Sequence, residues 1–167
     1  RLVSDWSSDV CSSDLVLRAK YKVYLADAGI APAVLLKGKS LLDDPGALGI
    51  ATETAVFKHL FARYYSTQIR FTYWRGKKGH EVDLVAELGG QLVPFEVKYR
   101  AAHTAPRDLK GLIEFCGLHE IERGYVVTKS LDDFGLMELP GEGKTKIMRI
   151  PAPLLCYWMG QTESQAL

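Results

Sequence analysis

Residues 80–100, HEVDLVAELGGQLVPFEVKYR, place charged side chains inside two apolar runs that are joined by Gly89-Gly90. A Gly-Gly pair between apolar runs predicts a two-residue β-hairpin turn, because a type I′ turn needs positive φ at both central positions. Side chains alternate along a strand, so counting outward from the turn predicts which residues share a face. Four charged residues are predicted to share one face at one end of the hairpin: Glu81, Asp83, Glu96 and Lys98.

The predicted register puts Asp83 directly opposite Glu96, and Glu81 opposite Lys98. Directly opposed carboxylates have Cβ atoms about 5 Å apart and destabilise the pair. A shared proton, a neighbouring cation or a bound metal ion would relieve this cost, and hard divalent cations such as Mg²⁺ choose carboxylate oxygens. The alternative is a solvated strand end, where Glu81 and Lys98 form an ion pair and the two acids are tolerated.

A helix is predicted over residues 47–65, where apolar residues recur at helical spacing. Glu53 lies on the apolar stripe of this helix. A carboxylate that faces a core without a partner is costly, so this position favours a role in the site. The alternative is an acid near the helix start that the helix dipole favours. The stripe consists of Ile50, Phe57, Leu60, Phe61 and Tyr64.

The other elements follow from local patterns of apolar and turn residues. Residues 35–49 are predicted to form a loop-rich connection with one helical turn and a break at Asp44-Pro45-Gly46. The uncharged face of the hairpin is predicted to face a core through Val82, Leu84, Ala86, Val93, Phe95 and Val97. Strands are predicted over 21–27, 68–74, 123–128 and 144–150, a helix over 106–119, and a helix or cap after Pro151. This order predicts an α/β fold with a mixed β-sheet flanked by helices.

Composition limits the classes of protein to consider. The chain has 167 residues, of which 47% are hydrophobic, and this predicts one domain with a sizeable core. No apolar run approaches the roughly 20 residues of a membrane span, and no membrane partner is expected. Three widely spaced cysteines fit neither a zinc site nor a disulfide framework, so a cytoplasmic location is expected.

Basic residues cluster beside the acidic hairpin although the formal net charge is only +1. Their position favours contacts with phosphates of a nucleic acid. The alternative is that they only keep the surface soluble. The residues proposed to contact nucleic acid are Arg75, Lys77, Lys78, His80 and Arg100.

Four segments, taken in order, resemble one known family. They are KVYLADAGI, GIATETAVFKHL, YWRGKKGHEVDLVAELGGQLVPFEVKYR and GYVVT. Together they are similar to the C-terminal DUF4143 domain of AAA-type ATPases, from about Lys22 to the end of the chain. The acid on one strand followed by Glu-x-Lys on the next also resembles the PD-(D/E)xK superfamily, whose fold is restriction-endonuclease-like.

The resemblance implies roles for individual residues. Asp83, Glu96, Glu53 and the backbone carbonyl of Val97 would hold Mg²⁺ or Mn²⁺, and Lys98 would orient or deprotonate a water. The implied activity is a metal-dependent endonuclease that hydrolyses phosphodiester bonds of DNA. The alternative is a non-catalytic module of the same fold that binds DNA or protein or regulates an ATPase.

An ATP site is not expected in this chain itself. The stretch GEGKT, residues 141–145, lacks the spacing of a phosphate-binding loop. By resemblance, ATP would be bound only by an N-terminal ATPase domain that the present sequence lacks, so residues 16–167 are expected to be a fragment of a longer chain. Residues 1–15 include DWSSDVCSSDL, which reads as a translated sequencing adapter, and they are left out of the fold prediction.

Overall fold

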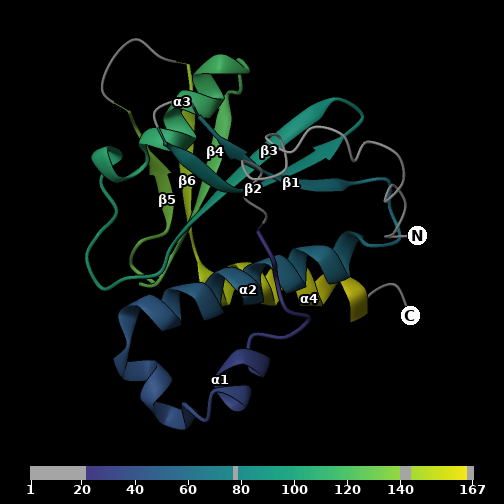
Figure 1. Cartoon of the computed structure of the whole chain (residues 1–167). Coiled ribbons are helices and arrows are strands. Elements are labelled where there is room, and N and C mark those ends of the chain that lie inside the picture. The colour runs from purple at the N-terminus through teal and green to yellow at the C-terminus, as the bar shows by residue number, and fades with distance from the viewer. Residues whose placement is uncertain (1–21, 77–78, 140–143, 165–167) are drawn as a thin grey trace, which may run out of the picture.

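The fold is described by a computed structural model that covers residues 22–76, 79–139 and 144–164 (Figure 1). Its α-helices are α1 (Ile30–Val34), α2 (Pro45–Tyr64), α3 (Lys110–Leu118) and α4 (Ala152–Ser164), and two 3-10 helices are η1 (Gly38–Asp43) and η2 (Pro106–Asp108). Its strands are β1 (Arg70–Arg75), β2 (Glu81–Leu88), β3 (Gln91–Lys98), β4 (Arg123–Thr128), β5 (Gly135–Met137) and β6 (Lys146–Pro151).

Within these described ranges, six strands form one sheet in the order β1-β2-β3-β4-β6-β5. Neighbours from β1 to β3 are antiparallel, β3, β4 and β6 run parallel, and β5 is antiparallel to β6. Helix α3 packs on one face of the sheet, and α2 and α4 pack together on the other (Figure 1). The predicted mixed sheet flanked by helices is confirmed.

The β2–β3 hairpin follows the register that its turn dictates. Gly89 has φ of 57° and Gly90 has φ of 83°, values that glycine adopts at little cost. Pairing runs from Leu88 opposite Gln91 as far as Leu84 opposite Phe95, as predicted. The ladder ends there, and the predicted direct pairing of Asp83 with Glu96 is not formed.

A bulge between β1 and β2 changes which side chains of β2 face each helix layer. Thr72 pairs with Val85 but Trp74 pairs with Val82, so two residues of β2 lie opposite one residue of β1. Such an insertion shifts the alternation by one position. Val82 therefore packs with α3, whereas Leu84 packs with α2 and α4, and the prediction that they share a face is wrong. The residues that keep the predicted face with Leu84 are Ala86, Val93, Phe95 and Val97.

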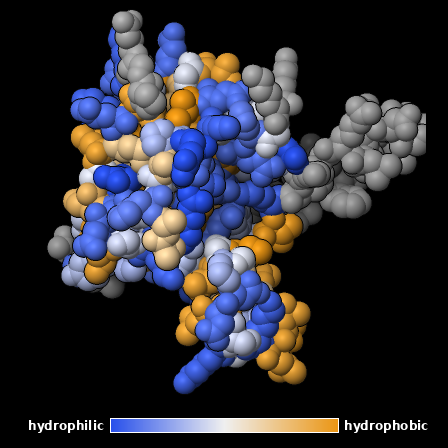
Figure 2. All heavy atoms as spheres, turned by 90° about the vertical axis from the view of Figure 1, so that its left-hand side faces the viewer, coloured by the Kyte–Doolittle hydropathy of each residue, from blue (hydrophilic) through white to orange (hydrophobic). Residues whose placement is uncertain are grey.

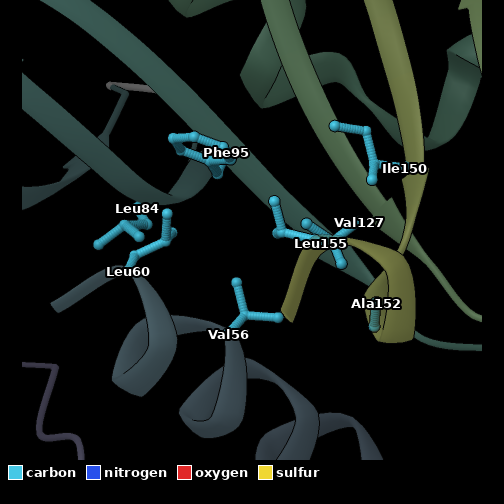
Figure 3. Close-up of a cluster of buried hydrophobic side chains, with 8 residues drawn as sticks. All are labelled: Val56, Leu60, Leu84, Phe95, Val127, Ile150, Ala152 and Leu155. Atoms are coloured by element: carbon cyan, nitrogen blue, oxygen red, sulfur yellow. The ribbon is translucent and has the colours of Figure 1, made fainter. Parts of the chain in front are cut away.

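The core against α2 and α4 is drawn in Figure 3. Val56 and Leu60 of α2 and Leu155 of α4 meet the sheet residues Leu84 and Phe95 there, and all five are buried. Complete burial of one such side chain stabilises the fold by about 1.5–3 kcal/mol. This cluster fixes α2 against the strands that carry Asp83 and Glu96.

The second core lies under α3, where Leu112 and Phe115 pack with Val82 and other apolar residues of the sheet. The helix comes unusually close at Gly111, because a Cβ there would lie 2.1 Å from the carbonyl oxygen of Glu81. Only glycine allows this approach. Helix α3 therefore packs directly over the start of β2, next to the charged end of the hairpin.

Helix α2 starts where a break was predicted. The Asp44 carboxylate accepts hydrogen bonds from the N–H groups of Gly46 and Ala47 at 3.1 and 3.0 Å, and Pro45 takes the first helical turn. Both are favourable at a helix start. The Asp-Pro-Gly sequence is thus the start of α2, and Pro45 and Gly46 already belong to the helix.

The buried face of α2 overlaps the predicted stripe only in part. Its buried residues are Thr54, Val56 and Leu60, whereas Ile50 and Phe61 are exposed. Only part of the predicted stripe is therefore core. Glu53 keeps an inward-facing position for a different reason, which is the ion pairing described below.

Three further elements differ from expectation. Residues 22–27 form no strand in the described part of the chain, so the strand predicted over 21–27 is wrong. The helix predicted over 106–119 is divided into η2 and α3, and β5 was not predicted.

The segment from α1 through η1 carries exposed apolar side chains, among them Val34, Leu36 and Leu42. Figure 2 shows hydrophobic surface around this lowest part of the molecule.

Candidate functional site

The hairpin opens at the end that carries its acids. Beyond the last ladder pair, the N–H of Asp83 donates to Glu96 Oε2 at 3.3 Å, and the N–H of Val97 donates to Asp83 Oδ2 at 2.8 Å. Side-chain oxygens thus replace the backbone partners that a continued ladder would supply. The two carboxylates lie close together, as predicted, but each is bonded to the other strand's backbone.

An ammonium group joins Asp83 to Glu53. Lys22 Nζ lies 2.7 Å from Asp83 Oδ1 and 2.8 Å from Glu53 Oε1, and the three side chains are 24%, 16% and 24% exposed, respectively. The contacts link residues 31 and 61 positions apart in the sequence. Of the three ways to relieve acid repulsion considered above, the structure uses a neighbouring cation at Asp83.

Tyr24 completes this arrangement. Its hydroxyl donates to Glu53 Oε1 and lies 3.3 Å from the carbonyl oxygen of Asp83, and its ring stacks on Phe57 with centroids 4.4 Å apart. Burial and the hydrogen bond to Glu53 raise the pKa of Tyr24 far above its usual value, so it is a neutral donor. Lys22 and Tyr24 therefore approach the acids from the same segment.

The pKa of Lys22 is raised although burial lowers it, because hydrogen bonds and charge interactions with Asp83 and Glu53 outweigh burial. Its ammonium form is therefore retained at neutral pH. A fixed positive charge therefore lies between the carboxylates of Asp83 and Glu53.

Glu96 has a different environment. It is only 6% exposed, and its partner is Lys98, whose Nζ lies 2.6 Å from Glu96 Oε1. Burial and then the charge of Asp83 raise the pKa of Glu96 to about 7, while Lys98 acts to lower it. Glu96 can therefore hold or release a proton near neutral pH, which is a property of acid–base groups in active sites.

Glu81 does not join the cluster. Its carboxylate pairs with Arg75 at 3.2 Å, so the alternative of a Glu81–Lys98 ion pair is wrong. The bulge in β2 accounts for this, because it removes the simple register on which that pairing depended.

The basic residues beside the hairpin also have partners. His80 Nδ1 contacts Glu114, and Arg100 lies 2.5 Å from Asp108. Lys77 and Lys78 lie outside the described residues. Since His80, Arg75 and Arg100 each pair with a carboxylate, a phosphate would have to compete for them.

Sequence reasoning missed Lys22 and Tyr24 as site residues. They sit two positions apart in a short apolar run, so they point the same way in an extended chain. The only signal available was the need of Glu53 and Asp83 for a positive partner. Nothing local indicates that residue 22 meets residue 83.

The donor chemistry suits a hard divalent cation, but the arrangement is not a complete metal site. Glu53 and Asp83 both aim carboxylate oxygens at one point, which Lys22 Nζ occupies. Among the residues that the structure covers, no three His, Cys, Asp or Glu side chains are grouped to hold a metal ion. The two carboxylates around Lys22 are the kind of ligand that Mg²⁺ or Mn²⁺ prefers, and the ammonium takes the place that such an ion would need.

The fold and the site define a mixed α/β domain with an acidic cluster at the open end of a hairpin. A family model described as "Domain of unknown function (DUF4143)" matches residues 48–153, which is more than half of the chain, and the chain belongs to this family. Glu53, Asp83, Glu96 and Lys98 lie inside the matched region, and Lys22 lies before it. Comparison with curated proteins and with solved structures finds no match.

A membrane-crossing segment was not expected from the sequence. Of the helices in the described ranges, none has the length and apolar character needed to cross a membrane.

Proposed function

We propose that this domain is a metal-dependent DNA endonuclease of the PD-(D/E)xK type with a restriction-endonuclease-like fold. The observation that supports this most is the convergence of Glu53 from α2, Asp83 from β2, and Glu96 and Lys98 from β3 at one end of the sheet. Apolar packing alone does not require three acids and two lysines in one partly buried cluster. We further propose that the domain works together with an AAA-type ATPase domain that binds ATP.

The carboxylates of Asp83, Glu53 and Glu96 would hold Mg²⁺ or Mn²⁺, together with the backbone carbonyl of Val97. A divalent ion in this place supplies Lewis-acid chemistry, because it activates water and neutralises charge on a phosphodiester. Asp83 is already oriented for this role, since the Val97 N–H fixes one of its oxygens and leaves the other directed towards α2.

The chain's own residues would do the remaining work. Lys98 carries a positive charge that Glu96 holds 2.6 Å away, and this pair can orient a water and a phosphate oxygen. Arg75, Arg100 and His80, with Lys77 and Lys78, would contact the DNA backbone. The carboxylate partners of Arg75, His80 and Arg100 are partly exposed, so a phosphate would replace them at these three residues.

The alternative is a non-catalytic module that binds DNA or protein or regulates the ATPase domain. The observation that favours it is the ion pairing itself, since Lys22 and Lys98 neutralise acids that a nuclease needs for metal. In that case the cluster would only join the segment before α1 to the sheet.

DNA cleavage by the full chain tests the proposal. Supercoiled plasmid is incubated with the parent protein in Mn²⁺ or Mg²⁺, and with Glu96→Gln and Glu87→Gln prepared identically. Glu87 lies in the same hairpin but pairs with Arg70 at its turn end, so Glu87→Gln is a matched control. We expect cleavage by the parent and the control, and a loss of about 100-fold or more in Glu96→Gln, since even indirect metal partners contribute 10–100-fold.

Equal cleavage by all three proteins would point to a contaminating nuclease and count against the proposal. If the folded parent does not cleave, calorimetry with Mn²⁺ decides between the alternatives. Absence of metal binding would favour the non-catalytic module.

A further inference from the structure

Two carboxylates from different elements converge on a single nitrogen atom. Lys22 Nζ is 2.8 Å from Glu53 Oε1 and 2.7 Å from Asp83 Oδ1, with the hydroxyl of Tyr24 bonded to the same Glu53 oxygen. Val56 of α2 and Leu84 of β2 pack in the same core cluster, so the core itself holds these two elements next to each other. The two acids are thus brought together by the fold, and Lys22 fills the position between them.

The ion pair of Lys58, a second lysine in the same region, is an exposed pair with which Lys22 can be compared. Lys58 of α2 pairs with Asp27, and those side chains are 44% and 51% exposed. Lys58 has one carboxylate partner and lies in solvent. Lys22 instead has two partners, in a partly buried place where charge interactions are stronger. Its position is that of a bound cation.

The segment that carries Lys22 is held by side-chain contacts and not by strand pairing within the described ranges. Residues 22–25 have no strand partner in the ranges described, and Val23 between the two inward side chains is highly exposed. The segment is therefore fixed by side chains: Lys22 and Tyr24 contact the acids, Tyr24 also stacks on Phe57, and Asp27 pairs with Lys58. If another cation takes those carboxylates, little backbone pairing opposes withdrawal of Lys22.

We propose that Lys22 is a built-in cation that competes with a divalent metal ion for the carboxylates of Glu53 and Asp83. The inference rests on the proposed metal-dependent function, and it adds a control on that site. Metal binding and the Lys22 contacts exclude each other, because both use the same carboxylate oxygens. The position of Lys22, in the segment before α1, therefore depends on whether a metal ion is bound to Glu53 and Asp83.

Competition of this kind raises the apparent Kd for the metal ion. The apparent Kd equals the intrinsic Kd divided by the fraction of molecules in which the site is free. If Lys22 occupies the position for about nine-tenths of the time, the apparent Kd is about tenfold weaker than the intrinsic value. Replacing Lys22 with methionine removes the charge and keeps a similar length. The variant Lys22→Met should therefore bind divalent metal about tenfold more tightly than the parent.

Calorimetric titration of the full chain with Mn²⁺ tests this, with Lys58→Met as the matched control. Tighter binding by Lys22→Met, with Lys58→Met equal to the parent, would support the inference. Binding by Lys22→Met that is equal to or weaker than that of the parent would overturn it, while leaving the metal-dependent function in place. Absence of binding in both parent and Lys22→Met would overturn the proposed function and the inference together.

A second measurement uses only the parent protein, so it holds even if Lys22→Met does not fold. Lysines are acetylated with an amine-reactive ester with and without saturating Mn²⁺, and the extent at each lysine is read by mass spectrometry. We expect acetylation of Lys22 to rise several-fold with metal, while that of Lys58 stays constant. Unchanged acetylation of Lys22 in a protein that binds Mn²⁺ would overturn the inference.

Discussion

The two ends of the β2–β3 hairpin are held by different interactions. At the turn end, Gly89 and Gly90 set the register, and ladder pairs run from Leu88 and Gln91 inward. At the open end the ladder stops, and the Asp83 and Glu96 carboxylates accept backbone N–H groups across the gap. The same two strands thus change from backbone pairing to side-chain pairing within a few residues.

This difference shows how a sheet can present charged groups without losing its hydrogen bonds. A buried N–H without a partner is costly, so strands that separate need substitutes. Asp83 and Glu96 provide them, and each keeps a second oxygen for a lysine. The chemistry of the candidate site therefore depends on the point at which the ladder ends.

The largest expected effect concerns packing at that point. Leu84 belongs to the last ladder pair and is 4% exposed, whereas Leu88 at the turn is 50% exposed. Leu84→Ala should lower the free energy of unfolding by about 2–5 kcal/mol, and Leu88→Ala should change it by less than about 0.5 kcal/mol. Urea unfolding measures both. Similar losses would mean that the open end is not packed more tightly than the turn.

The turn end could be predicted from sequence because its information is local. Gly89-Gly90 and the alternation around it fix the pairing down to Leu84 and Phe95 without knowledge of any other element. Helix α2 and strand β4 follow from local patterns in the same way. The bulge between the Thr72 and Trp74 pairs carries no such signal, and it places Val82 on the other face.

The open end could be predicted only in part. The acids and Lys98 were identified because their charge is unusual in apolar strands. The partners of these residues were not identified. Lys22 contacts Asp83 from 61 positions away in the sequence, and the ion pair of Arg75 with Glu81 depends on the register that the bulge sets. Long-range charge contacts depend on the finished fold, whereas the strand predicted over 21–27 relied on local residue pattern alone.

A smaller effect concerns the proton of Glu96. Its pKa rises from 4.5 to about 7, so the folded state holds this proton more tightly than the unfolded chain. The associated stability is fully present below pH 4.5 and is lost as the pH rises to about 7. At about 1.4 kcal/mol per pKa unit, the loss is on the order of 3 kcal/mol.

Glu96→Gln removes this titration, because the amide stays neutral. We therefore expect the free energy of unfolding of the variant to change less than that of the parent between pH 5 and pH 8. The groups that face Glu96 are Asp83 and Lys98, and Lys22 is bonded to Asp83, so unfolding is compared in metal-free buffer. Parallel pH profiles for the two proteins would show that Glu96 binds no extra proton in the folded state over this range.

The smallest effect is expected at the turn end, where charge is present but exposed. Arg70 Nη2 lies 2.6 Å from Glu87 Oε2, and the Arg70 side chain is 70% exposed. Exposed pairs of this kind contribute little and are screened by salt. Arg70→Met should leave the urea midpoint unchanged within error, in low and in high salt. A clear loss in low salt that disappears in high salt would mean that the turn end also depends on charge, and the contrast between the two ends would then be one of degree.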